Sequence, residues 1–404
     1  MDAQHEGATV TEQVSPRPRR TTFLPFATPH ITQAEIDEVV DTLRSGWLAI
    51  GPKTKRFEAD FAAVVGARHA VACSSATAAL HLALDAIGIR PGDEVIVPDY
   101  TFTASAMVIV HMGARPVIVD VAPRTCNLDP ERFAAAITPR TRAVIVVDIA
   151  GLAADLDPIL AIARQHGIAV IEDAAHAFPS TYKGRMIGTI ADVTAFSFYA
   201  TKTLAVGDGG MLTTNDPAYA ERAAIMAMHG ISRDAWKRYS AQGSWFYEVL
   251  APGFKYNMTD ISAALGLQQL ERRDWLLERR RDISKRYTAA FENVNALETP
   301  PDSADGQHAW HLYMLRIRPD HLRIDRAEFI ERLQAANIGV SVHFIPLHMH
   351  PYYRDEFQLR PDDYPVAMDA FEREISLPIY PGMTDGDLDD VIQAVCDTVE
   401  AARL

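Results

Sequence analysis

FSFYATKTLAVGDGGMLTTND, residues 196–216, places one lysine, Lys202, between a small polar run and the glycine-rich turn at residues 207–210. Its charged neighbours along the chain are Asp208 and, ten residues away, Asp192. A lysine buried among small and aromatic side chains loses solvation, so its pKa falls and the neutral amine can attack a carbonyl carbon. The stretch therefore predicts a lysine that forms a Schiff base. The alternative is a lysine that reaches solvent from a surface loop.

The composition indicates a soluble globular protein with two domains. The chain has 404 residues, more than one ordinary core, and 48% of them are hydrophobic against 23% charged. A net charge of -14 argues against sequence-independent binding to nucleic acid. The three cysteines, Cys73, Cys126 and Cys396, are few and far apart, so we expect neither a disulfide framework nor a metal site. We find no membrane-spanning run and no signal peptide, and expect a cytoplasmic protein.

Three segments are expected along the chain. Residues 1–21 are polar and lack apolar periodicity, which predicts a disordered tail. Residues 22–265 are expected to form a large cofactor-binding domain, and residues 266–404 a linking helix and a smaller α+β domain. The helix from about residue 258 carries many arginines, which we expect on a solvated face.

The large domain is predicted to be an α/β domain built on a mostly parallel sheet. Short apolar runs alternate with helical stretches, which favours a sheet covered on both faces. The runs are HAVAC (69–73), EVIVPDYTF (94–102), ARPVIVDV (114–121), TRAVIVVDIAG (141–151) and IAVIEDAAHAF (168–178). Because functional residues of such sheets lie at the C-terminal ends of strands, Phe102 and Asp173 are candidates. Asp173 is alternatively a cap for a following helix.

A helix start rich in small hydroxyl residues follows the first strand, at SSATAALHLAL (74–84). Its backbone N–H groups and hydroxyls suit a phosphate, although serine and threonine there are also ordinary caps. Together with Lys202 and a carboxylate at Asp173 able to hold a protonated pyridine nitrogen, the pattern fits pyridoxal 5′-phosphate (PLP). Thr77 and Ala78, with Ser197, would hold the phosphate, and Phe102 would stack on the ring.

The chain resembles the DegT/DnrJ/StrS family of PLP-dependent sugar aminotransferases, which have the aspartate-aminotransferase (type I) fold. The resemblance covers about residues 22–400 and runs through SSATAALHLAL, GDEVIVPDYTFTASA, VIEDAAHAF, FSFYATKTLAVGDGG, GFKYNMTDISAALGLQQL and ISLPIYPGMTDGDLDDVI. Within the family the chain is most similar to the branch that makes UDP-4-amino-4-deoxy-L-arabinose. The features that it shares with this branch are EDAAHA, YKGRMIG, MHGISRDAWKR and the VHF segment followed by HPYYRDEF.

The resemblance implies roles for individual residues. Lys202 and Asp173 would be catalytic, and His176 would contact the cofactor ring. The cofactor site would comprise Ala76, Thr77, Ala78, Phe102, Asp173, His176, Ser197, Lys202 and Asn257. Asn257 would reach the phosphate of the neighbouring subunit, which implies a homodimer with shared active sites; its alternative role is to cap the helix that follows.

Substrate contacts are expected from Trp47, Tyr199, Arg233, Lys237, Lys255 and His343. The basic run at residues 228–239 supplies local positive charge that a nucleotide diphosphate would need, although such a run is also an ordinary solvated loop. His343, His348 and His350 lack the spacing of metal ligands on one helix face, so no metal is expected.

The resemblance predicts an aminotransferase that converts a nucleotide-linked 4-keto sugar, carried by UDP or dTDP, to the amino sugar with L-glutamate as donor. Alternatives within the family are amination at C3, amination of a keto-inositol, and a PLP-dependent dehydratase, whose members carry histidine where Lys202 stands. A non-catalytic relative would be expected to lose Lys202 or Asp173. A nicotinamide oxidoreductase lacks support, because no GxGxxG follows the first strand.

Overall fold

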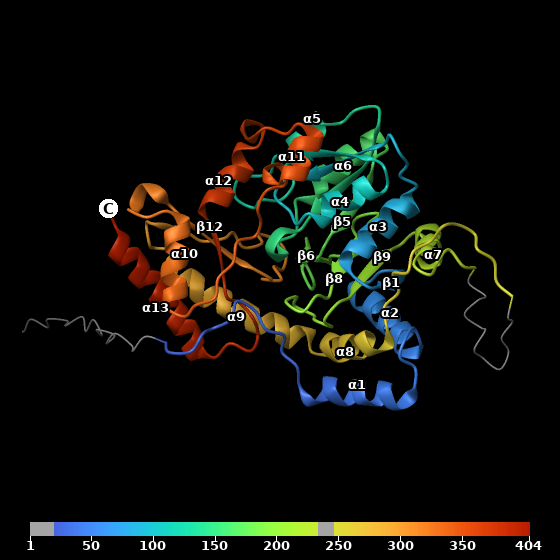
Figure 1. The fold of residues 1–404 in the computed structure, drawn as a ribbon, viewed down its shortest axis with the longest axis horizontal. Coiled ribbons are helices and arrows are strands. Elements are labelled where there is room, and N and C mark those ends of the chain that lie inside the picture. Colours follow the sequence, from blue (N-terminus) through green and yellow to red (C-terminus); the bar gives the residue numbers. More distant parts are fainter. Residues whose placement is uncertain (1–19, 233–245) are drawn as a thin grey trace, which may run out of the picture.

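The computed structural model describes residues 20–232 and 246–404. Two regions of the chain pack side by side (Figure 1): a large sheet covered by helices, and a smaller unit that contains α9, α10 and α13. No helix in these two ranges is long and apolar enough to cross a membrane. The expected tail at residues 1–21 lies outside the described residues except for its last two positions.

Seven strands form the large sheet. In spatial order they are β1 (His69–Cys73), β9 (Gly210–Thr214), β8 (Val193–Ser197), β5 (Ala169–Asp173), β4 (Thr141–Val147), β2 (Glu94–Pro98) and β3 (Arg115–Val119). The five strands from β8 to β3 pair in parallel, and β9 is antiparallel to both of its neighbours. The C-terminal ends of the parallel strands therefore meet at one edge, as the sequence predicts, and the mostly parallel α/β fold is confirmed.

The apolar runs are buried on both faces of the sheet. Along β2, Val95 and Val97 belong to one core cluster while Ile96 points into another, and β4 alternates in the same way. Fully burying one such side chain contributes about 1.5–3 kcal/mol, so continuous valine and isoleucine runs stabilise a two-sided sheet. The helices around the sheet are α1 (Gln33–Ser45), α2 (Pro52–Val65), α3 (Ala76–Ile87), α4 (Ala104–His111), α5 (Pro130–Ala135), α6 (Leu156–His166), α7 (Pro217–Met226) and α8 (Asp260–Glu271).

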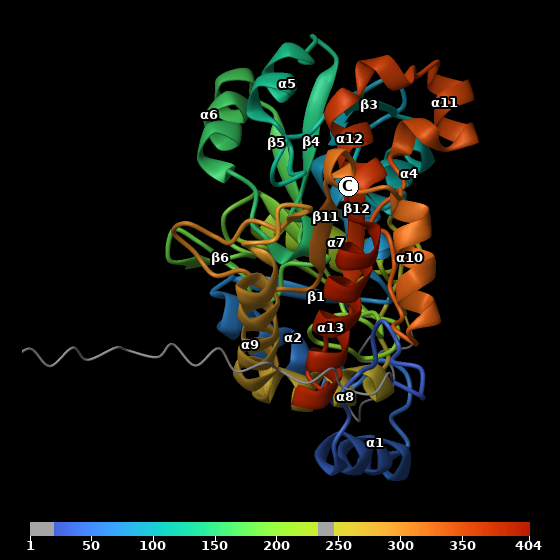
Figure 2. The same cartoon turned by 90° about the vertical axis from the view of Figure 1, so that its left-hand side faces the viewer.

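The C-terminal part has its own antiparallel sheet, ordered β10 (Leu297–Glu298), β11 (Tyr313–Ile317) and β12 (Glu374–Leu377). Figure 2 shows α9 and α13 running beside each other under this sheet. Its helices are α9 (Arg273–Phe291), α10 (Arg326–Ala335), α11 (Pro351–Phe357), α12 (Pro365–Arg373) and α13 (Asp385–Ala402). A hairpin of β6 (Thr181–Tyr182) and β7 (Arg185–Met186) completes the elements. The domain boundaries given above stay a prediction; Leu24 packs in the C-terminal core and Tyr353 in a core of the large sheet.

The expected long helix after residue 258 is two helices. It breaks at Arg272, which ends α8 and precedes α9. The expectation that its arginines are solvated is wrong for Arg280, which is 2% exposed. Arg280 follows Leu276 by four positions and precedes Ile283 by three, and both are buried, so it lies on the inward face of α9.

Candidate active site

Lys202 lies in the turn that follows β8, at the C-terminal edge of the large sheet. Its side chain is half-buried, and its Nζ lies 3.4 Å from Nε2 of His311. Burial is the main cause that lowers the pKa of the Lys202 amine to about 7; the guanidinium of Arg280 acts in the same direction and Asp173 opposes it. A large fraction of the amine is therefore neutral near pH 7, the form that attacks carbonyl carbon.

Asp173 is the last residue of β5 and is buried. Its Oδ2 accepts a hydrogen bond from the Ser105 hydroxyl at 2.7 Å, and its Oδ1 accepts one from the backbone N–H of Ala175 at 3.2 Å. Burial raises the pKa of Asp173, while these hydrogen bonds and the charge of Lys202 oppose that rise. Turns rather than a helix follow β5, so Asp173 does not cap a helix.

His176 presents a neutral imidazole to the same edge. Its Nδ1 accepts a hydrogen bond from the backbone N–H of Ala150 at 3.2 Å, which leaves the ring proton on Nε2. Burial is the main cause that holds the pKa of His176 well below its ordinary value. The ring stacks on Phe344 with centroids 5.7 Å apart. His176 is therefore a hydrogen-bond donor that does not carry charge.

The start of α3 and the end of β8 come together around Gly210. In the sheet Gly210 is paired with both Cys73 and Ser197. A Cβ on Gly210 would lie 2.4 Å from the carbonyl carbon of Ser75, so glycine is needed for this close approach. Ser75 caps α3 by accepting from the N–H of Ala78 at 3.1 Å, which confirms the capping alternative for this serine. Thr77 at the first turn is exposed.

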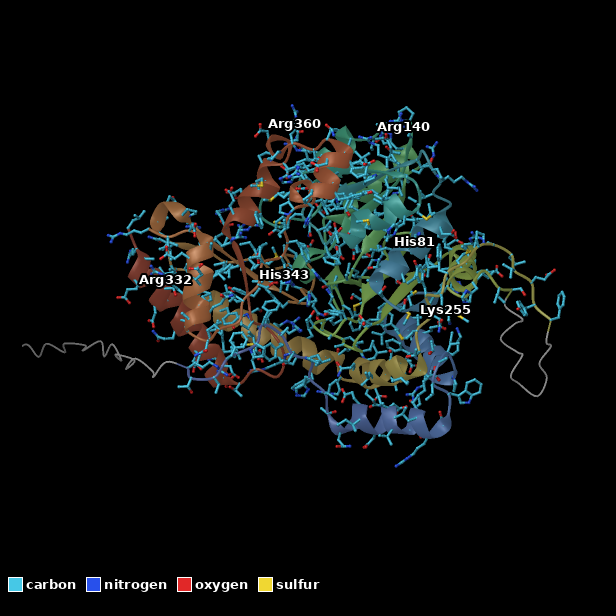
Figure 3. The ribbon with its side chains drawn as sticks, viewed as in Figure 1. His81, Arg140, Lys255, Arg332, His343 and Arg360 are labelled. Atoms are coloured by element: carbon cyan, nitrogen blue, oxygen red, sulfur yellow. The ribbon has the colours of Figure 1, made fainter. Side chains whose placement is uncertain are left out.

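Aromatic and imidazole side chains surround this edge. Phe102 is 57% exposed and its ring centroid lies 5.8 Å from that of Phe344. Tyr199, two residues after β8, is also exposed. His343 contacts Ser376 Oγ through Nδ1 at 2.9 Å, and its position is labelled near the middle of the molecule in Figure 3. Burial, with Lys202 adding to it, lowers the pKa of His343 to about 4.

Three further expected contacts have other surroundings: Trp47, and the neighbouring pair Lys255 and Asn257. Trp47 lies against Gly51 and is about half exposed. Lys255 donates to Oδ1 of Asn257, and Figure 3 shows Lys255 well apart from His343 in that view. Asn257 pairs with Cys73 through its backbone, at the outer edge of β1. The alternative in which Asn257 caps α8 is wrong, because the cap is Thr259, whose side chain accepts from Ser262 N–H at 3.2 Å.

Two expected substrate contacts, Arg233 and Lys237, lie outside the described residues. Within residues 20–232 and 246–404 no three histidine, cysteine, aspartate or glutamate side chains gather as metal ligands would. His348 instead contacts Asp99, with Nδ1 and Oδ2 2.6 Å apart.

Sequence reasoning missed three residues that contact Lys202, Asp173 or their flanking backbone: Ser105, His311 and Arg280. Ser105 sits in the first turn of α4, and a hydroxyl at a helix start signals only a cap. His311 precedes β11, and Arg280 stands in a run of arginines whose inward position shows only in its spacing from Leu276 and Ile283.

These residues fit PLP on the chemistry of the donors alone. A lysine amine with lowered pKa, a buried carboxylate and a neutral imidazole donor meet the needs of a carbonyl carbon, a pyridinium nitrogen and a phenolic oxygen. Gly210 packs closely against the start of α3, and the backbone N–H groups of a helix start suit a phosphate.

This site at the carboxyl edge of a mostly parallel sheet belongs to a PLP-dependent sugar aminotransferase of the type I fold. Among solved structures, Spr1654 of Streptococcus pneumoniae, described as a sugar aminotransferase in PLP and PMP forms, is 37% identical with a TM-score of 0.88, covering 94% of this chain and 98–99% of that one. The aminotransferase TlmJ of Streptoalloteichus hindustanus is 35% identical with a TM-score of 0.85 over 93% of this chain and 98% of that one.

The chain belongs to the DegT/DnrJ/EryC1/StrS aminotransferase family, whose model matches residues 29–396. It is 53% identical to the spore coat polysaccharide biosynthesis protein SpsC of Bacillus subtilis, over 95% of this chain and 99% of that protein.

Proposed function

We propose that the protein transfers the amino group of L-glutamate to C4 of a nucleotide-linked 4-keto sugar, carried by UDP or dTDP. Amination at C3, or of a keto-inositol, is the alternative that shares the same site. The observation that carries the proposal is the largely neutral character of the site: beside Lys202, Asp173 and the buried Arg280, it presents aromatic rings and imidazoles that burial keeps uncharged. Such a surface suits an uncharged sugar ring.

Lys202 is proposed as the reacting amine and the proton carrier. Its amine, neutral near pH 7, would hold the cofactor through the carbonyl carbon and, as a free amine, would carry the proton between the carbon that bears the nitrogen and the cofactor carbon. The 3.4 Å contact with His311 supports an amine held in one place. The lysine also counts against the dehydratase alternative.

The cofactor is proposed to be held by Asp173, by His176 and by the start of α3. PLP supplies a protonated ring that accepts the electron pair left when a carbon beside the nitrogen loses its proton. Asp173 keeps the proton on the ring nitrogen, because an ionised carboxylate in a buried place gains from a cationic partner. His176 donates from Nε2 to an oxygen on the ring. The N–H groups of Ala76 and Thr77, with Ser197, would bind the phosphate, and Ala78, whose N–H donates to Ser75 Oγ at 3.1 Å, would line the same place.

Phe102 is proposed to stack on the cofactor ring, and the exposed Tyr199, with His343, to contact the sugar. Trp47, Lys255, Arg233 and Lys237 are proposed to serve the nucleotide and its diphosphate. An enzyme of net charge -14 needs such local cations to hold a dianionic linker.

The enzyme is further proposed to work as a homodimer in which Asn257 serves the partner's phosphate site. Asn257 borders a groove of about 790 Å³ between α2, β1 and α7, whose lining includes Ile50, Met228 and Ile231. Apolar side chains in an open groove of this size suit burial by a second copy. The three cysteines are free thiols, which accords with a proposed location in the reducing cytoplasm.

The substrate is tested by incubating purified protein and L-glutamate with a panel of UDP- and dTDP-linked 4-keto and 3-keto sugars, and keto-inositol. Mass spectrometry reads amination of the product, and 2-oxoglutarate release reads the donor. We expect a 4-keto sugar nucleotide to be consumed fastest. Faster turnover of a 3-keto sugar or of keto-inositol would replace the proposed substrate, and Arg233→Ala and Lys237→Ala should raise only the sugar-nucleotide KM.

A further inference from the structure

Arg280 is a buried cation at the junction of the two parts of the chain. Its guanidinium donates from Nη1 to the carbonyl oxygens of Trp310 and His311, both at 3.2 Å, and of Ile379 at 2.7 Å. Nη2 lies 3.5 Å from the carbonyl oxygen of Thr201. These carbonyls come from three stretches far apart in the sequence, so one side chain joins the turn after β8 to the C-terminal part.

If Arg280 only stabilised the fold, its positive charge would have no explanation, because burying a charge is unfavourable. In the described part of the chain Arg280 forms no ion pair, and its Nε has no hydrogen-bond partner. Burial lowers the pKa of Arg280 to about 10, so the side chain stays charged at neutral pH. A buried cation without a counter-charge costs several kcal/mol, and bonds to neutral carbonyls offset only part of that cost.

The contacts of Arg280 converge on Lys202 from two sides. Thr201, whose carbonyl it contacts, is the residue before Lys202, and His311, whose carbonyl it also binds, places Nε2 3.4 Å from Lys202 Nζ. The backbone N–H of His311 is held as well, by the carbonyl of Ala150 at 2.9 Å. The guanidinium therefore contacts both the backbone that precedes Lys202 and the backbone of His311, the residue whose ring meets the amine.

We propose that Arg280 is a positioning residue for Lys202: its guanidinium, bound to the carbonyls of Thr201 and His311, fixes the Lys202–His311 pair, and as a second cation it adds to the effect of burial in disfavouring the ammonium form of Lys202. This inference takes Lys202 as the reacting amine, as proposed above. A second cation nearby disfavours an ammonium, which is one general way to activate a lysine nucleophile.

The charged and titratable groups around Lys202 are Asp173, Arg280 and three histidines. Asp173 is the anion nearby and acts against it, by favouring the ammonium. His176, His311 and His343 are kept neutral by burial and carry no opposing charge. Arg280 is thus a fixed positive charge that offsets part of the effect of Asp173 on the amine, in the same direction as burial.

The test measures the protonation of Lys202 without cofactor or substrate, so it is independent of turnover. Cofactor-free protein is treated with formaldehyde and a borane reductant between pH 5 and 10, and peptide mass spectrometry gives the methylation rate of Lys202 at each pH. We expect a midpoint near 7 in the wild type. In Arg280→Gln, and in Arg280→Met as a second neutral variant, we expect a midpoint higher by about one pH unit.

Two variants separate charge from packing. Arg280→Lys keeps a positive charge but loses the planar guanidinium. In this variant the pH midpoint of Lys202 methylation should stay close to the wild-type value. Arg281→Met removes the neighbouring, more exposed cation of α9, which pairs with Glu278 at 3.0 Å, and should change nothing. Circular dichroism and the melting temperature confirm that each variant is folded.

An unchanged midpoint in a folded neutral variant would overturn the proposal. An equal rise in Arg280→Lys and Arg280→Gln would also overturn it, because water entering a disturbed site would then explain both shifts. Failure of the substrate panel would leave these midpoints unaffected, so the proposed reaction and this inference can fail separately.

Discussion

The hydroxyl of Ser105 lies 2.7 Å from Oδ2 of Asp173, although 68 residues separate them in the chain. Ser105 stands in the first turn of α4 and Asp173 ends β5, so the contact joins a helix to a strand across the edge of the sheet. Ser105 also contacts Thr101, with the two hydroxyl oxygens 2.8 Å apart. A hydroxyl donor favours the ionised carboxylate, which burial alone would disfavour.

Ser105→Ala is expected to weaken the function of Asp173 without removing it. A hydrogen bond to a charged group contributes about 1.5–3 kcal/mol, so kcat/KM should fall by about tenfold or more, with weaker binding of PLP. Kinetics and a cofactor titration followed by absorbance measure both. Ser284→Ala on α9, whose hydroxyl donates to the Arg281 carbonyl at 2.9 Å, is the control. Wild-type kinetics in Ser105→Ala would contradict this role.

Asp173→Asn should fold normally and lose most of its activity, because an amide cannot hold a ring proton as a carboxylate does. The loss should exceed that of Ser105→Ala and should affect both half-reactions. Stopped-flow absorbance with glutamate alone measures the first half-reaction. Activity near that of the wild type would refute the proposed role of this carboxylate.

Lys202→Ala should bind PLP but turn over negligibly. Borohydride treatment of the wild-type holoenzyme should fix the cofactor on Lys202, and peptide mass spectrometry identifies the modified residue. Lys183→Ala, which removes a surface lysine paired with Asp157 at 2.6 Å, is the matched control and should retain activity. Recovery of the adduct on another lysine would sink the assignment of Lys202.

Those parts of the site that depend on local sequence patterns could be predicted. Valine and isoleucine runs mark where strands end, so Asp173 could be placed at the edge of the sheet, and the unusual surroundings of Lys202 marked its turn. Ser105, His311 and Arg280 reach the site through packing of α4, α9 and the segment before β11. From the sequence alone, Ser105 indicates a helix cap, His311 the approach to a strand, and Arg280 a charged helix face. Their place at the active site depends on tertiary contacts.

The buried carboxyl pair of Asp148 and Glu172 predicts an effect of pH on the stability of the fold. Asp148 and Glu172 are fully buried, and burial raises the pKa of both carboxyls, that of Glu172 to about 7. Because the folded-state pKa exceeds the unfolded one of about 4.3, this carboxyl stabilises the fold at low pH and its contribution is lost as pH rises through about 7.

Glu172→Gln should remove this dependence. Between pH 5 and pH 8 the free energy of unfolding of the wild type should fall by about 2 kcal/mol more than that of the variant. Urea unfolding at both values measures it. Glu356→Gln, on the exposed face of α11, should behave as the wild type does. Equal pH dependence in Glu172→Gln and the wild type would show that the Glu172 carboxyl has the same pKa in the folded and unfolded states.

The last prediction concerns the proposed sharing of active sites. If Asn257 acts in the partner's site, a mixed dimer of Lys202→Ala and Asn257→Ala has both lesions in one site and an intact second site. Two weakly active preparations should then regain up to about a quarter of the wild-type activity after subunit exchange, since half of the dimers are mixed and each has one intact site. The measurement is made at limiting PLP, where Asn257→Ala alone must be strongly impaired.

A matched mixture separates complementation from mere stabilisation by mixing. Lys202 and Asp173 serve the same chain, because Asp173 raises the pKa of the Lys202 amine within one subunit. Lys202→Ala mixed with Asp173→Asn should therefore place one lesion in each site and restore nothing. If Lys202→Ala with Asn257→Ala also restores nothing after confirmed exchange, Asn257 acts in its own subunit or in neither. Its backbone pairing with Cys73, just before the α3 start, would then make the phosphate site of its own chain the next place to test.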